Sequence, residues 1–169
     1  MREVAELSED GRIVRIDNVC WSYYKNTELE SELDRDKCGK WMHYFTDIGF
    51  AEYICRKAVF EGIVTECKHT GPDVLEGEER GVICFYLNSD DEAAHRRVLA
   101  FMLENGLIRK TKAGKLYDIG FKLDEQTRAG EYGSKFSAKI SLRDFVNLET
   151  GEFLQRGAEG LLDASRKPE

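Results

Sequence analysis

Alternation of apolar and polar residues, the period of a half-buried strand, dominates the first half of this chain. The strand patterns cover residues 11–17, 18–26, 39–45, 63–70 and 81–88. The first two meet at Asp17 and Asn18, a common turn pair, and therefore predict a hairpin. Residues 81–88, GVICFYLN, are nearly all apolar, which is typical of a strand in the middle of a sheet.

Two stretches between these strands have the period of an amphipathic helix. Asp47 can cap the first helix, and Gly62 ends it. Ser89 and Glu92 have the spacing of a capping box at the start of the second helix, which ends at Asn105. Helices that follow strands of a mostly antiparallel sheet predict an α+β fold, a curved sheet with helices packed on one face and the other face open.

Residues 117–143 combine two more alternating segments with a glycine-rich loop between them. In each segment the apolar side chains share one face, and cationic side chains lie on the other. The polar face and the loop together supply Lys122, Thr127, Arg128, Tyr132, Lys139 and Arg143. Gly130 and Gly133 allow a ligand to approach the backbone closely. We predict an anion-binding face, although an ordinary hairpin with a solvated, charged outer face explains the pattern equally well.

The other stretches have loop or short-strand character. Residues 27–37 fit either a short exposed helix or a loop, and residues 71–81 fit an exposed acidic loop. Residues 144–154 predict one more strand, with a turn near its end. For the basic segment 109–115, RKTKAGK, we favour a solvated turn over a binding patch because no aromatic residue is interleaved with the cations.

The composition is that of one globular domain. A chain of 169 residues, 41% of them hydrophobic, is long enough to bury one sizeable core. We predict that residues 11–154 form this domain and that residues 1–10 and 155–169 are flexible ends.

The charge and the apolar runs limit the partners and the location. A net charge of −7 argues against broad coating of nucleic acid, while a local basic face remains compatible with it. No apolar run reaches the ~18 residues that span a bilayer, and the first residues lack the apolar stretch of a signal peptide. We therefore predict a cytoplasmic protein without a membrane partner.

The sequence indicates no metal or cofactor. The cysteines lack the CxxC spacing of zinc sites and are predicted to be reduced, mostly in the core: Cys20, Cys38, Cys55, Cys67 and Cys84. The three histidines show neither metal-ligand nor catalytic-triad spacing.

Three segments, GKWMHYF, GVICFYLNSDDEAAHRRVLAFM and IGFKLDEQTRAGEYG, resemble the basophilic-leukaemia-expressed protein domain family, which is little characterised. The resemblance covers about residues 19–145 and implies the fold of the cap-binding translation initiation factor 4E. It places a lysine of that family at Lys68, which joins the predicted ligand-binding residues. It also matches a second lysine of the family at Lys122.

The same resemblance matches the T-G-Y pattern of the family at Thr127, Gly130 and Tyr132. Cap binding requires two tryptophans that sandwich a methylated guanine. This chain has only Trp21 and Trp41, both in predicted strands, so we do not expect cap recognition. The concave face of the implied fold still suits phosphate recognition by lysine and arginine.

Three functions remain open from the sequence. The first is a non-enzymatic module that binds a phosphorylated ligand, either a nucleotide or a nucleic-acid end, on the concave cationic face. The second is a small acidic protein that inhibits another protein, as phage anti-defence proteins do, through segments 28–36 and 76–79. The third is a phospho-lyase in which Lys68 serves as base and His69 as acid. Of these we favour the non-enzymatic module.

Overall fold

The computed structural model describes residues 4–155. The chain divides into two compact units. Among the described residues, unit 1 consists of residues 4–33 and 40–87, and unit 2 consists of residues 34–39 and 88–155. The sequence predicted a single domain over residues 11–154. That the two units fold together as one cooperative domain stays a prediction.

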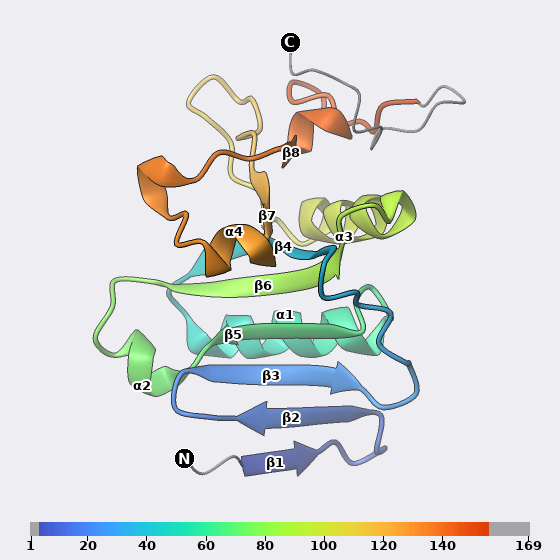
Figure 1. The fold of residues 1–169 in the computed structure, drawn as a ribbon, viewed down its shortest axis with the longest axis vertical. Helices are drawn as coiled ribbons and strands as arrows, with labels where there is room; N and C mark the ends of the chain where they lie inside the picture. Colours follow the sequence, from blue (N-terminus) through green and yellow to red (C-terminus); the bar gives the residue numbers. More distant parts are fainter. Residues whose placement is uncertain (1–3, 156–169) are drawn as a thin grey trace. The chain divides into compact units, whose positions relative to one another are not determined.

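Unit 1 is built on an antiparallel sheet (Figure 1). Its strands, in spatial order, are β1 (Val4–Leu7), β2 (Ile13–Asp17), β3 (Trp21–Asn26), β5 (Glu66–Thr70), β6 (Gly81–Asn88) and β4 (Cys38–Phe45). β4 begins in unit 2 and enters unit 1 at Lys40. The predicted hairpin is confirmed, because β2 and β3 pair antiparallel from Ile13 with Asn26 to Asp17 with Ser22. β6 lies between β5 and β4, in the interior of the sheet as its apolar sequence predicted.

Helix α1 (Ile48–Phe60) covers one face of this sheet. Figure 1 shows it lying along β5 and β3 on their far side. The carboxylate of Asp47 caps it by accepting from the backbone N–H groups of Gly49 and Phe50, as predicted. The side-chain amide of Asn26 donates to the carbonyl of Val59 at 2.8 Å and joins the helix to β3. A short helix, α2 (Pro72–Leu75), lies in the segment that was predicted to be a loop.

Unit 2 holds the helix α3 and the last strands. Its elements are α3 (Glu92–Glu104), β7 (Gly120–Leu123), α4 (Asp124–Arg128), η1 (Gly133–Lys135), β8 (Ile140–Ser141) and η2 (Leu142–Asp144). The start of β4 lies beside β7, since a Cβ added at Gly39 would sit 2.5 Å from the Phe121 ring and 2.7 Å from the Lys122 carbonyl oxygen. Only glycine fits this approach without displacing backbone. The imidazole of His95 stacks on Phe145 and meets Phe121 edge-on in the core of this unit.

The α+β class and the antiparallel sheet predicted from the sequence are confirmed, while several details differ. Val4–Leu7 forms a strand within the segment predicted to be a flexible end. Asp91 caps α3, where the sequence predicted Ser89. The second strand predicted in residues 117–143 is reduced to Ile140–Ser141, and the loop before it contains α4 and η1. The strand predicted over 144–154 is a single bridge, between Val146 and Phe153.

Four of the five cysteines are buried and Cys20 is exposed, and all five are free thiols. The prediction that most of them lie in the core is confirmed. Among the described residues, no helix is both long enough and apolar enough to cross a membrane.

Candidate functional site

The face of the unit 1 sheet that points away from α1 gathers aromatic rings around a lysine. Strand pairing sets Lys68 of β5 opposite Tyr23 of β3 on one side and opposite Cys84 of β6 on the other. Directly paired residues share a face, so all three side chains point away from the helix. Trp21 and Tyr86 lie two residues from Tyr23 and Cys84 along the same strands and therefore join this face.

The ammonium group of Lys68 lies against these rings. Its Nζ is 3.7 Å from the ring centroid of Trp21, 5.6 Å from that of Tyr23 and 5.7 Å from that of Tyr86. Lys68 and the three aromatic residues are each half-buried, so each residue is partly accessible to solvent. A cation beside aromatic rings can pair with an anion while a ring stacks on a flat group of the same ligand.

A second lysine reaches the same cluster from β4. Nζ of Lys40 lies 5.7 Å from the ring centroid of Tyr86, and only 7% of Lys40 is exposed. We name Trp21, Tyr23, Lys40, Lys68 and Tyr86 the cation–aromatic cluster. Burial raises the pKa of the Tyr23 phenol above an ordinary value that already keeps it protonated at neutral pH, and the protonated phenol can donate a hydrogen bond. Together these side chains can hold an anion attached to a flat aromatic group.

The opposite face of the same strands carries a buried polar network beneath α1. The hydroxyl of Tyr24 and Nε2 of His69 are 3.0 Å apart, and Nδ1 of His69 lies 2.8 Å from the carbonyl oxygen of Thr70. Because a carbonyl only accepts, Nδ1 carries the proton and Nε2 accepts from Tyr24. Arg15 pairs with Asp17 at 2.9 Å, and its guanidinium lies 5.5 Å from the Tyr24 ring centroid. This network holds β5 in place from the face that packs against α1, and so it positions Lys68 on the opposite face.

His69 cannot act with Lys68 on one substrate. Successive residues of a strand point to opposite faces, and His69 is fully buried on the helix side. This geometry contradicts the pairing of base and acid that the phospho-lyase hypothesis required.

The stability of the fold should fall below about pH 6.5 through His69. Burial is the main cause that lowers the pKa of His69 below its ordinary value of 6.5. The unfolded chain therefore binds a proton below that pH where the folded chain does not, so the stabilisation is intact above pH 6.5 and declines as the pH falls toward the lowered pKa. Urea denaturation between pH 7.5 and pH 5 measures this loss. The His69→Gln variant should lose less stability over that range, and an equal loss in both proteins would contradict the role of His69.

The residues predicted from segment 117–143 all lie in unit 2. Lys122 was predicted to be exposed, but only 5% of it is exposed. Its Nζ lies 3.9 Å from the ring centroid of Tyr132 and 5.3 Å from that of Phe136. The structure thus brings Lys122 and Tyr132 together, with the exposed ring of Tyr132 covering the lysine.

The other predicted residues lie on or next to several elements of unit 2. The guanidinium of Arg143 faces the carboxylate of Asp118 at 3.5 Å. Thr127 and Arg128 lie on α4, in what was predicted to be a loop. Arg128 and Lys139 are exposed, and within residues 4–155 neither forms an ion pair. Lys68 belongs to unit 1. Of the predicted set, the structure therefore shows Lys122 and Tyr132 in contact.

Other features of the described chain offer less chemistry. Residues 4–155 contain no group of three or more histidine, cysteine or acidic side chains that could hold a metal ion. An open depression in unit 2 is lined by Arg96, Phe153, Leu154 and Gln155. Arg96 already donates to the carbonyl oxygen of Leu154 at 2.8 Å and pairs with Glu92, so the depression offers no free cation.

No protein-family profile and no curated protein matches this chain. The resemblance to the basophilic-leukaemia-expressed protein domain family therefore stays a prediction.

Sequence reasoning found Lys68 but missed its surroundings. Trp21 was interpreted as structural, and Tyr23, Lys40 and Tyr86 were not selected. The alternation WSYYK already placed Trp21 and Tyr23 on one face of a strand. The sequence did not reveal that β3 pairs with β5, because β4 and α1 lie between these two strands along the chain.

Proposed function

We propose that this protein is a non-enzymatic binding module for a phosphorylated aromatic ligand, such as a nucleotide or a nucleic-acid end. The ligand is held on the cation–aromatic cluster of unit 1. The observation that carries the proposal is the ammonium group of Lys68 at 3.7 Å from the ring centroid of Trp21, with Tyr23 and Tyr86 beside it. The cytoplasm, where such ligands are abundant, is the proposed location.

Each part of such a ligand has a partner in the cluster. A phosphate pairs with the ammonium of Lys68, because charge-assisted hydrogen bonds to phosphate are about twice as strong as neutral ones. A base stacks on a half-buried ring, since every base has an aromatic face. The phenol of Tyr23 adds a hydrogen-bond donor. The thiol of Cys84 lies on this face, but Cys84 is only 2% exposed and is poorly placed to attack a ligand, which favours binding over catalysis.

The resemblance to the initiation factor 4E fold supports the same face, since in that fold a curved sheet with helices behind it presents its ligand on the concave side. The proposal differs from cap recognition, because Trp21 lies on a strand rather than in a loop. The proposed site is the cation–aromatic cluster around Lys68, whereas the sequence favoured segment 117–143.

The alternative is an acidic inhibitor protein that binds another protein. The exposed acids of residues 76–79 support it, together with the net charge of −7. In that case the cation–aromatic cluster serves only to stabilise the sheet, and protein partners bind elsewhere.

The test is a binding screen by thermal shift and calorimetry over mononucleotides, cyclic dinucleotides, 5′-phosphorylated dinucleotides and inorganic phosphate. A ligand at 100 times its dissociation constant adds about 2.7 kcal/mol to the free energy of unfolding. Lys68→Gln should then weaken the best ligand about ten-fold or more, which corresponds to the loss of one charge-assisted hydrogen bond.

Lys25→Gln is the matched control, because Lys25 is exposed on the same face of β3 and the substitution removes the same charge. It should bind like the native protein. Equal affinity of the Lys68→Gln and native proteins, or no ligand in the panel, would contradict the proposal and leave the inhibitor alternative.

A further inference from the structure

Residues 109–117 of unit 2 form a small hairpin whose base is anchored and whose tip projects. The backbone N–H of Tyr117 donates to the carbonyl of Arg109 at 2.9 Å, and that of Thr111 donates to the carbonyl of Lys115 at 2.7 Å. Gly114, with φ of +81°, closes the turn by donating to the carbonyl of Thr111. Leu116 is buried and holds the hairpin to the unit through a bond to the carbonyl of Leu148.

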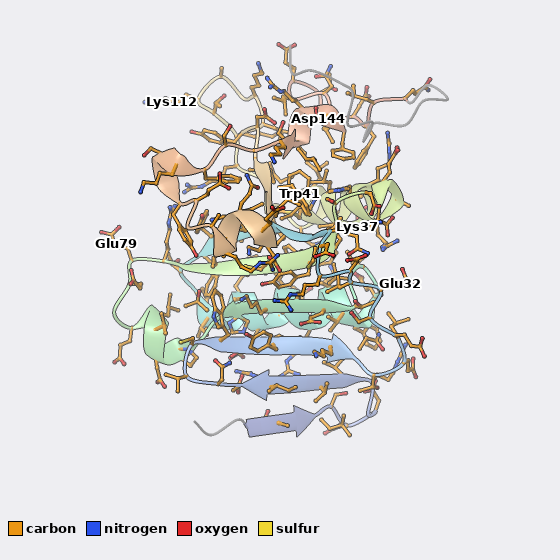
Figure 2. The ribbon with its side chains drawn as sticks, viewed as in Figure 1. Glu32, Lys37, Trp41, Glu79, Lys112 and Asp144 are labelled. Atoms are coloured by element: carbon orange, nitrogen blue, oxygen red, sulfur yellow. The ribbon has the colours of Figure 1, made fainter. Side chains whose placement is uncertain are left out.

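The hairpin concentrates positive charge on an acidic protein. Arg109, Lys110, Lys112 and Lys115 are all exposed, and the segment 105–117 contains no acidic residue. In the part of the chain that the structure describes, none of these four side chains enters an ion pair. Figure 2 shows Lys112 at the tip of the hairpin, pointing outward. Their charge is therefore available to a partner.

The hairpin also places an aromatic ring among the cations. Lys110 pairs with Leu116, so Arg109 stands opposite Tyr117 and Thr111 opposite Lys115. Positions two apart share a face of a strand, and directly opposite residues share it as well. Arg109, Lys115 and Tyr117 thus lie on one face, and 51% of Tyr117 is exposed. The sequence favoured a solvated turn because no aromatic residue is interleaved with these cations. The strand pairing places Tyr117 beside them, so that reason no longer holds.

We propose that this hairpin binds single-stranded nucleic acid, with phosphates paired by Arg109, Lys112 and Lys115 and a base stacked on Tyr117. A basic surface that carries an exposed ring is the combination by which proteins hold single strands with little sequence preference. The site shares no residue with the cation–aromatic cluster and does not depend on the function proposed for that cluster.

The shape of the tip distinguishes this partner from an anionic membrane. The turn residues are Thr111, Lys112, Ala113 and Gly114, and none of them carries a large apolar side chain. Segments that bind the membrane interface insert such side chains below the headgroups. A hairpin tip without them favours a polyanion that is contacted along its backbone.

The contact is short, because the net charge of −7 on the whole chain opposes a longer footprint. Neutralising about three phosphates of a single strand gives a slope of about −2 for the logarithm of the association constant against the logarithm of salt concentration. Binding should therefore be strong only at low ionic strength, and this slope is a direct readout of the contacts.

The experiment measures fluorescence anisotropy of labelled DNA and RNA 12-mers that carry a 5′-hydroxyl, at about 50–200 mM salt. These probes lack the terminal phosphate that the cluster around Lys68 is proposed to hold. The double variant Lys112→Glu/Lys115→Glu should bind about ten-fold more weakly or worse, with a slope shallower than about −1. Tyr117→Ala should lose about five-fold or more, and Tyr117→Phe should retain binding because it keeps the stacking face.

The control is Arg35→Glu/Lys135→Glu, which reverses the charge of two exposed residues elsewhere on unit 2 and should leave binding within about two-fold. Lys68→Gln should also bind these probes normally, so failure here is distinguishable from failure of the function proposed above. The inference is overturned if the native protein does not bind at 50 mM salt, if the hairpin and control variants lose affinity equally, or if anionic vesicles bind in preference to the oligonucleotides.

Discussion

Replacing Trp41 by alanine is expected to remove about 3–5 kcal/mol from the free energy of unfolding. Trp41 is the largest side chain that is fully buried in the described chain, with none of its surface exposed. It lies on β4, and the neighbouring strand of β4 in unit 1 is β6. The space left by an indole is too large for the neighbouring side chains to fill by relaxation. Because this loss approaches the whole stability of many small domains, the variant should be largely unfolded at 37 °C.

Denaturant titration followed by tryptophan fluorescence and circular dichroism measures the loss. The control is Tyr44→Ala on the same strand, because Tyr44 is 50% exposed and the loss should stay below about 1 kcal/mol. Equal losses in the two variants would show that Trp41 is not part of the core in solution.

The strands were predictable where neighbours in sequence are also neighbours in space. The hairpin of β2 and β3 needs only the alternation and the turn at Asp17 and Asn18. The pairing of β3 with β5 was not predictable in the same way, because β4 and α1 intervene along the chain. The cation–aromatic cluster depends on that pairing, so Lys68 was found from a resemblance while its aromatic neighbours were missed.

Competition between two equally good caps explains the start of α3. Both Ser89 and Asp91 have side chains that can accept from the first turn of a helix. In the structure the carboxylate of Asp91 accepts from the N–H of Ala94 at 3.0 Å, and the carbonyl of Ser89 accepts from Nε2 of His95 at 2.9 Å. This bond from His95, six residues further along the chain, accompanies the boundary at Asp91, and the spacing of the capping box alone does not distinguish the two caps.

Lys122 shows the limit of alternation as a guide to exposure. The period of two assigned Lys122 correctly to the face opposite Phe121, but it carried no information about what covers that face. The segment after α4 returns over it, with Tyr132 and Phe136 against the ammonium. Gly120 permits the return, because a Cβ there would lie 2.6 Å from that of Ala138. The lysine expected to bind a ligand is thus a packed residue.

The Lys122→Glu variant should therefore lose about 2–4 kcal/mol of stability, although the sequence predicted an exposed charge whose reversal costs almost nothing. The substitution places a carboxylate against the negative faces of two aromatic rings, at a position that is 5% exposed. Lys122→Met keeps the length and apolar character of the stem and should lose less than about 1.5 kcal/mol. Lys139→Glu makes the same charge change at an exposed position and should stay within about 0.5 kcal/mol of the native protein. Denaturation midpoints of the three variants separate burial from charge. If Lys122→Glu unfolds at the same midpoint as Lys139→Glu, the rings of Tyr132 and Phe136 do not enclose the lysine in solution, and an exposed anion-binding face in residues 117–143 becomes the better interpretation.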